Sequence, residues 1–560
     1  MFPLLESLLR LLIVISTSRP HRSLPNWLKG TFDLELETIG FYPYQVKAYV
    51  EKAFTNLETC EVDSKKVDKS LVRIPIQLDA LCYTWDGFGG RTIPQTMTAV
   101  YKAIEQSLWQ KDAVNLGKRT NEDARDALPG EIRNAVENEA YLLGVFAFTG
   151  MHNDVIDFES EHRSAILEQF NPKPSLGLDK TLQRLSFLRS SDPLLNDRYQ
   201  TYHFLHFTFQ EFFAARYFVQ QWKAGHPLKC LTLNGGQTED IEPTSLLRKH
   251  KYTARYDVFW RFVAGLLDAE GKAEGFFAAI EDKPRDLLGP THQRLIMHCL
   301  SEVSPKMPLR RSLEETLKQW LLFECDFIKQ ACLASEVEFP EHALFDALQE
   351  ESNVKITILR WLQWRPTIPS RIVNLTPSWL GDGESTDLKR AAMDILRAQS
   401  SLSDQILTAV VARVEDQDWE VRRAAVDVLR AQSSLSDPIL TAVVACLEDQ
   451  DKHIRRAAVN ALGVQSSLSD PILTGVAVYL EDQDRDDWKV RQAVVDILRA
   501  QSSLSDPILA ANVRRAAVNV LRAQSGLSDP ILTAIAAHLQ DQDWNVRRAA
   551  INATWQQGGR

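Results

Sequence analysis

The sequence has few cysteines, and they form no recognisable pattern. Seven are scattered along 560 residues: Cys60, Cys82, Cys230, Cys299, Cys325, Cys332 and Cys446. They form no Cys-x-x-Cys pair, and no histidine cluster accompanies them. This scatter argues against a disulfide framework and against a structural zinc site. It suits the reducing cytosol, so the predicted localisation is cytoplasmic and no metal site is expected.

Long apolar runs are also lacking. The apolar stretch near the N-terminus is interrupted by Arg10, has no basic residue before it and no small-residue cleavage site after it. A signal peptide needs those features, and a membrane span needs about 20 apolar residues. We therefore expect no membrane partner. The run Leu11–Ile15, closed by Ser16–Pro20, instead predicts a buried strand of a parallel sheet with a functional loop at its end.

An excess of positive charge is lacking as well. The net charge is -10, with an ordinary 44% of hydrophobic and 25% of charged residues, so nothing draws the whole chain to nucleic acid. Four Arg-Arg steps near the C-terminus lie in segments rich in Asp and Glu: Arg422-Arg423, Arg455-Arg456, Arg514-Arg515 and Arg547-Arg548. We expect these arginines to pair with acidic residues of neighbouring units, and predict no specific nucleic-acid partner.

What the sequence does have is a repeat. The motif Gln-Ser-Ser/Gly-Leu-Ser-Asp occurs five times, with its leucine at positions 402, 435, 468, 504 and 527. The spacings are 33, 33, 36 and 23 residues. Self-similarity at such a period is typical of solenoids, in which each unit buries its apolar face against its neighbours.

Each unit reads as two helices. Asp437 is expected to cap a helix that begins at Pro438, and an apolar stripe follows at Leu440, Val443, Val444 and Leu447. In the preceding unit a second helix places an apolar stripe on one face, made of Val421, Ala424, Ala425, Val428 and Leu429. The sequence therefore predicts an α-solenoid of helix hairpins.

The second helix resembles HEAT repeats. The pattern Asp-x-x-Val-Arg-Arg-Ala-Ala-x-x-x-Leu at 418–429 carries the resemblance, and similar strings return at 513–521 and 546–554. Weaker copies at 354–362 and 388–396 place the array at about 335–560. HEAT arrays bind proteins, so the resemblance implies a protein partner.

A comparison of the units suggests where that partner binds. Core positions barely change, whereas one helix position and the turn before the second helix vary among the units. A ligand-reading surface and neutral drift at solvated positions explain this variation equally well. The candidate partner-binding ridge consists of Arg413, Trp419, Glu420, Cys446, Lys452, His453, Tyr479, Trp488, Lys489, His538, Trp544 and Asn545.

The first half contains a second resemblance. The string at 202–218, with Phe204, His206, Thr208, Phe209, Gln210, Glu211, Phe212, Ala214 and Ala215, resembles the winged-helix segment of NACHT-type NTPases of the NLR (STAND) class. Ser16–Pro20 is similar to the sensor-1 end of a NACHT domain. Residues 34–54, 74–87 and 93–106 resemble the segments that follow it, in the same order.

The resemblance implies roles for three residues. Arg19 would face the γ-phosphate, Pro75 would lie against adenine, and His206 would donate a hydrogen bond to the β-phosphate of ADP. Each also has a structural interpretation: a solvated loop residue, the first residue of a helix, and a histidine satisfied within the core. For His206 the structural interpretation is preferred.

The phosphate cradle of that class is not found. The motif Gly-x-x-x-x-Gly-Lys-Ser/Thr and an acidic strand end for Mg²⁺ would precede sensor 1. The residues before Arg19 include no Asp, Lys or Gly. Catalytic motifs such as Gly-x-Ser-x-Gly and His-Glu-x-x-His are absent from the sequence. We therefore expect no catalytic residues and no cofactor, with ATP or ADP bound only if a P-loop lies upstream.

Together these patterns predict a mainly α chain: a NACHT-remnant strand, a helical and winged-helix region, then a HEAT-like solenoid. The expected segments are 1–30 (NACHT remnant, truncated before sensor 1), 31–130 (helical), 131–225 (winged-helix-like), 226–334 (helical linker) and 335–560 (solenoid). The expected function is a non-catalytic scaffold or sensor, the C-terminal part of an NLR-like signalling protein in innate immunity or self/non-self recognition. Its oligomeric state is left open. The alternatives are a truncated or mis-started ATP-dependent NACHT switch, and a HEAT adaptor in trafficking or assembly.

Overall fold

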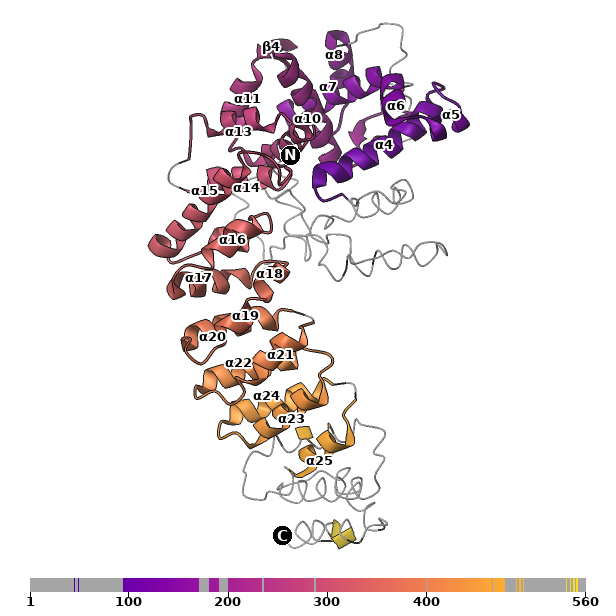
Figure 1. Ribbon diagram of the computed structural model, residues 1–560. Coiled ribbons are helices and arrows are strands. Elements are labelled where there is room, and N and C mark those ends of the chain that lie inside the picture. The colour runs from indigo at the N-terminus through magenta and orange to yellow at the C-terminus, as the bar shows by residue number, and fades with distance from the viewer. Residues whose placement is uncertain are drawn as a thin grey trace, which may run out of the picture. The chain divides into compact units, whose positions relative to one another are not determined.

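The computed structural model describes residues 94–170, 181–190, 200–233, 236–286, 289–399, 401–465 and 467–478, together with isolated residues near 45–49 and between 490 and 551. The predicted strand at 11–15, Arg19 and Pro75 lie outside the described residues. The chain is mainly helical, as expected (Figure 1). It divides into two compact units. The first contains Met1–Trp320 and Glu336–Ala343, and the second Leu321–Ser335 and Leu344–Arg560.

The described part of the first unit consists of helices and two short antiparallel strand pairs. Its antiparallel strand pairs are β1 with β2, in which Leu188 faces Phe204, and β3 with β4, in which Leu228 faces Ile241. In chain order the elements are α4 (Met97–Asn115), α5 (Asn121–Asp126), α6 (Pro129–Ala135), α7 (Glu137–Asn153), α8 (Ser160–Phe170), β1 (Leu188–Ser190), β2 (Tyr202–Phe204), α10 (Phe207–Ala224), β3 (Leu228–Thr232), β4 (Gln237–Ile241), α11 (Pro243–His250), η2 (Ala254–Tyr256), α12 (Asp257–Asp268), α13 (Ala273–Glu281), α14 (Thr291–Leu300) and α15 (Arg310–Phe323).

Helix α10 lies at the centre of this unit and packs against α7 and α12. Leu205, Phe209, Phe212 and Phe213 recur at the spacing of one helical face, and the three phenylalanines are buried on α10. Leu205 is half-buried and precedes the helix, because β2 occupies 202–204 and α10 begins only at Phe207. The helix ends at Gly225, whose φ of 65° is the left-handed conformation that glycine adopts at low cost.

The second unit is a stack of helix pairs. Helices α20, α22 and α24 contact one another in sequence, and α21, α23 and α25 form a parallel row of contacts. Its elements are η3 (Glu324–Ile328), η4 (Cys332–Ser335), α17 (Ser352–Leu362), α18 (Ser370–Val373), α19 (Thr376–Trp379), α20 (Thr386–Arg397), α21 (Asp404–Val411), α22 (Trp419–Arg430), α23 (Asp437–Ala445), η5 (Cys446–Glu448), α24 (Lys452–Gly463) and α25 (Asp470–Val478), with α16 (Glu341–Ala347) crossing the division between the units.

The buried faces follow the predicted periodicity with three differences. On α22 Val426 is buried and Ala424 is only half-buried, and on α23 Val444 is half-buried. The prediction that Asp437 caps α23 is wrong. Ser436 is the N-cap residue, Asp437 is the first residue of the helix, and no side chain caps it. The acidic side chain instead lies in the first turn, where the helix dipole favours a negative charge.

No helix in the described part of the chain is long and apolar enough to cross a lipid bilayer.

Candidate binding sites

His206 occupies a structural position at the start of α10. Its side chain accepts a hydrogen bond from the Thr208 backbone amide at 3.3 Å and lies 2.8 Å from the Thr208 hydroxyl. A group that satisfies a free amide at a helix N-terminus stabilises that helix. These contacts give His206 a structural role at the helix N-terminus. The nucleotide-contacting role remains a prediction.

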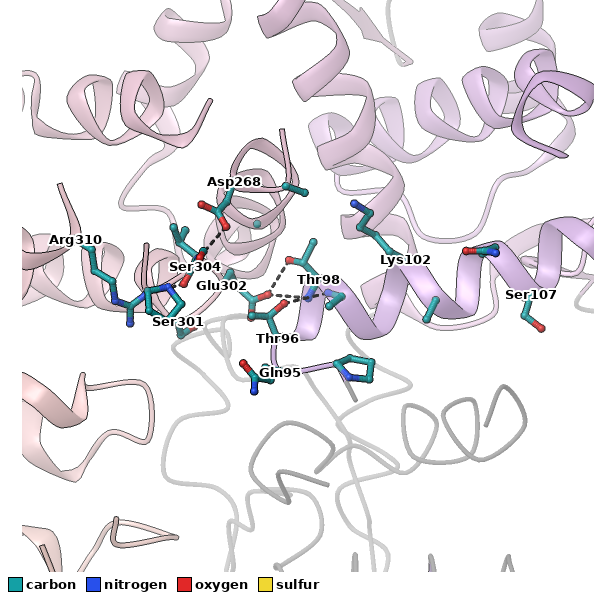
Figure 2. A pocket seen from close by; sticks show the side chains of 18 of the residues that line it. Gln95, Thr96, Thr98, Lys102, Ser107, Asp268, Ser301, Glu302, Ser304 and Arg310 are labelled. Carbon is teal, nitrogen blue, oxygen red and sulfur yellow. Dashed lines mark hydrogen bonds between the residues drawn. The ribbon is translucent and has the colours of Figure 1, made fainter. Parts of the chain in front are cut away.

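A cavity of about 800 Å³ lies between α4, the end of α12 and the segment after α14 (Figure 2). Thr98 donates two hydrogen bonds of 2.7 Å to the buried carboxylate of Glu302, one from its amide and one from its hydroxyl. Asp268 accepts from the Ser304 amide at 2.8 Å. Both carboxylates therefore hold elements together, and we interpret this cavity as a structural junction rather than an acid–base site.

A partly buried charge network joins α12, α14 and residues 336–338. His298 lies 2.7 Å from Asp257 and 3.4 Å from Glu336. Arg294 and Arg261 donate to Glu336 and Glu338 at 2.6 and 3.1 Å. Burial alone would lower the pKa of His298, but its hydrogen bonds to Asp257 and Glu336 raise it to about 9.

The same residues offer ligand atoms for a cation. Nitrogen and oxygen atoms of His298, Glu336 and Glu338 lie within 4.8 Å of one another. A metal ligand must be a neutral imidazole, whereas this histidine is held in its protonated form, and an arginine already compensates each glutamate. We therefore interpret the cluster as an ion-pair network.

This network predicts a pH-dependent stability. The folded-state pKa of His298, about 9, lies above its ordinary value of 6.5, so its stabilisation is complete below pH 6.5 and is lost as the pH rises through about 9. We expect the first unit to lose about 2–3 kcal/mol of unfolding free energy across this window. Hydrogen exchange of α14 amides at pH 6.5 and pH 9 measures this loss, after correction for the intrinsic exchange rate.

The matched variants are His298→Gln, which should show a much smaller loss, and His453→Gln on the exposed face of α24, which should behave as the wild type. An equal pH dependence in His298→Gln and the wild type would contradict this account.

In the second unit, ion pairs link neighbouring repeats. Lys389 of α20 contacts Asp416 at 2.9 Å, and Arg422 of α22 donates to both carboxylate oxygens of Asp449 at 2.8 and 3.3 Å. Arg455 donates to the Asp449 backbone carbonyl within its own repeat at 2.9 Å. The expected pairing of a repeat arginine with an acidic residue of the neighbouring repeat is therefore present for Arg422.

A second ladder runs through the glutamine of the repeat motif. Gln432 donates to the Gln399 carbonyl at 3.0 Å and accepts from the Leu402 amide at 3.2 Å. One repeat later, Gln465 makes the same bonds to the Gln432 carbonyl and the Leu435 amide, at 3.0 and 3.1 Å. Both glutamine side chains are buried. The sequence identified this motif as a repeat but did not predict the ladder, although the glutamine that recurs at a fixed position in every copy was the available signal.

The structure corrects part of the proposed ridge. Cys446 is buried, so it cannot belong to an exposed surface, and burial raises the pKa of its thiol to about 12. Cys446 is the first residue of the short 3₁₀ turn η5, so a position that varies among the repeats is buried here. Arg413 is largely buried and pairs with Asp382 and Asp416.

Other ridge residues are accessible. Trp419 is 42% exposed, Trp544 is 58% exposed, and Lys452 and His453 are exposed at the start of α24. Glu420 is half-buried and pairs with Arg390. Tyr479, Trp488, Lys489, His538 and Asn545 lie outside the described residues.

We call the accessible surface of α20, α22 and α24 the array face. A shallow hollow of about 200 Å³ lies on it between α20 and α22. The array face includes five residues that line this hollow: Arg390, Asp394, Trp419, Glu420 and Arg423. It also includes Lys452 and His453, which occupy the positions of Trp419 and Glu420 one repeat later.

Comparison with protein families identifies the repeats. The HEAT-repeat family matches residues 373–463 and 407–499. Residues 373–499 are HEAT repeats. The helix pairs from α18 to α25 are therefore those of a HEAT α-solenoid, as the sequence predicted.

Other comparisons add little to this assignment. A domain of unknown function, DUF7068, matches residues 63–96. No curated protein matches the chain. A crystal structure of an engineered protein shares 14% identity, with a TM-score of 0.24, over 63% of this chain and 95% of its own.

Proposed function

We propose that this chain is a non-catalytic scaffold whose HEAT array binds a protein partner through the array face. One observation carries the proposal: Trp419 lies 42% exposed beside charged side chains on a surface of stacked repeats. Tryptophan and arginine are the residues most often found at the centre of protein interfaces. HEAT repeats commonly serve as protein-interaction scaffolds, which supports this role.

The charge pattern of the array face favours a protein over a polyanion. Arg390 is paired with Glu420, and Arg423 lies 3.8 Å from Asp427. Arg397 lies 3.5 Å from Asp394. Because cations and carboxylates alternate, the face offers no continuous basic stripe of the kind that nucleic acid requires.

We also propose that the chain acts in NLR-like signalling of self/non-self or pathogen recognition, in the cytoplasm. The order of its motifs from Ser16 to Ala215 supports this proposal. The alternative is an ATP-dependent NACHT switch. Calorimetry with Mg·ATP separates the two: the scaffold should show no Mg²⁺-dependent binding, and tight binding would favour the switch.

The partner-binding role predicts the effect of removing one tryptophan. Trp419→Ala should weaken partner binding by about 30-fold, since truncation of an interface hot spot costs about 2 kcal/mol or more. The measurement is proximity labelling in the native cell, with the labelling enzyme fused to the chain. A defined set of proteins labelled by the wild type should no longer be labelled by Trp419→Ala.

Trp364→Ala is the matched control, because Trp364 is 72% exposed and lies outside the matched repeats. If both variants label the same proteins as the wild type, the array face is not the binding surface.

A further inference from the structure

A second cavity, of about 780 Å³, lies in the first unit between α4, the α6–α7 segment, α10 and residues 266–272. Five lysines and arginines and three glutamates line it, an excess of two positive charges in a chain whose net charge is -10. Two of the cations are compensated. Arg216 pairs with Glu105, and Lys223 lies 2.5 Å from Glu270.

The other three cations are uncompensated. The side chains of Lys102, Arg133 and Lys272 make no ion pair or hydrogen bond with any described residue, and Glu137 is the remaining carboxylate of the lining. Lys102 is half-buried and lies on α4 between the two cavities, so it lines the first cavity as well (Figure 2).

The position of Lys102 is electrostatically unfavourable. Its pKa is lowered, first by burial and then by the positive charges of Arg133 and Arg216, with Glu270 as the opposing charge. A half-buried ammonium without a partner has lost hydration that nothing in the described structure replaces. If Lys102 served only in a structural ion pair, a carboxylate would replace its lost hydration. An anion bound among these cations would replace it instead.

We propose that this cavity binds a small soluble compound carrying two or more phosphate charges, held by Lys102 and Arg133. Arg133 supplies the planar fork that matches phosphate oxygens, and Lys102 supplies a compact charge beside it. Tyr141, Asn138 and Gln220 also line the cavity and can donate hydrogen bonds to such a ligand. The volume lies in the range of small-molecule sites, about 300–1,000 Å³.

The site is independent of the nucleotide contacts implied for the NACHT class. Arg19, Pro75 and His206 are not among its lining residues. It also does not depend on the array face, which belongs to the other compact unit.

Calorimetric titration of the full chain with pyrophosphate at low ionic strength tests the proposal. We expect micromolar binding, at least tenfold weaker in Lys102→Gln and in Arg133→Gln, because each substitution removes a charge-assisted contact to the phosphate. Lys229→Gln is the matched control. Lys229 is exposed on β3, does not line either cavity, and its loss changes the net charge equally.

Two further ligands test which chemical class of anion the cavity binds. Citrate, a polyanion of carboxylates, should bind at least tenfold more weakly than pyrophosphate, and so should a phosphoserine peptide. Equal binding of citrate would overturn the phosphate assignment, and tighter binding of the peptide would overturn the small-molecule assignment. Equal pyrophosphate affinity in the wild type and both variants would overturn the site itself.

Folding is checked separately. Lys102→Gln should unfold thermally at or above the wild-type temperature without ligand, because it removes an unpaired half-buried charge. A loss of thermal stability in this variant would contradict the premise that Lys102 is uncompensated.

Discussion

Replacing Phe213 with alanine is expected to lower the unfolding free energy of the first compact unit by about 3–5 kcal/mol. The Phe213 side chain is fully buried on α10. Its ring centroid lies 4.9 Å from Phe187, 5.7 Å from Phe212 and 6.1 Å from Phe204. Removal of the ring would leave a cavity among aromatic side chains that cannot move inward to fill it.

Hydrogen exchange of α7 and α10 amides measures this change within the first unit alone. Phe327→Ala is the control, since Phe327 is 77% exposed and should change stability by less than about 0.5 kcal/mol. Unchanged protection of α10 in Phe213→Ala would show that the aromatic cluster does not hold the helix.

Replacing Gln432 with alanine is expected to destabilise the array by about 1–3 kcal/mol. The substitution leaves the Gln399 carbonyl and the Leu402 amide without the side chain that satisfies them. In a solenoid each repeat contacts only its neighbours, so the loss of protection should be concentrated in α20, α21 and α22.

Gln450→Ala is the matched control for the glutamine ladder. Gln450 is exposed in the turn before α24, and its side chain contributes no bond to the ladder. Protection factors of the α20–α22 amides should fall in Gln432→Ala and stay constant in Gln450→Ala. An equal response of the two variants would mean that the repeats are held by apolar packing alone.

Local periodicity was enough to predict the solenoid. The apolar spacing of α22 and α23 and the 33-residue repeat indicate stacked helix pairs before any coordinates are considered. The interpretation of the arginines as internal partners was also confirmed for Arg422 and Asp449. Both inferences depend on spacing along the chain, which a repeat makes visible.

Contacts between distant residues could not be predicted in this way. The network around His298 joins residues 257, 298 and 336, and the cavity around Lys102 brings α4 beside α10 and residues 266–272. The local sequence pattern does not predict these contacts, because they arise from tertiary packing. The burial of Cys446 was missed for a related reason: variation among the repeats was taken as a sign of exposure, whereas Cys446 occupies a varying position and is buried.

The most direct test of the scaffold proposal is site-specific photocrosslinking in the native cell. A p-benzoylphenylalanine residue is placed either at Lys452, on the array face, or at Thr441, an exposed position of α23 in the other row of helices. The account predicts a discrete protein adduct from position 452 and none from position 441. Adducts from position 441 alone, or from neither position, would contradict the claim that the array face binds a protein partner.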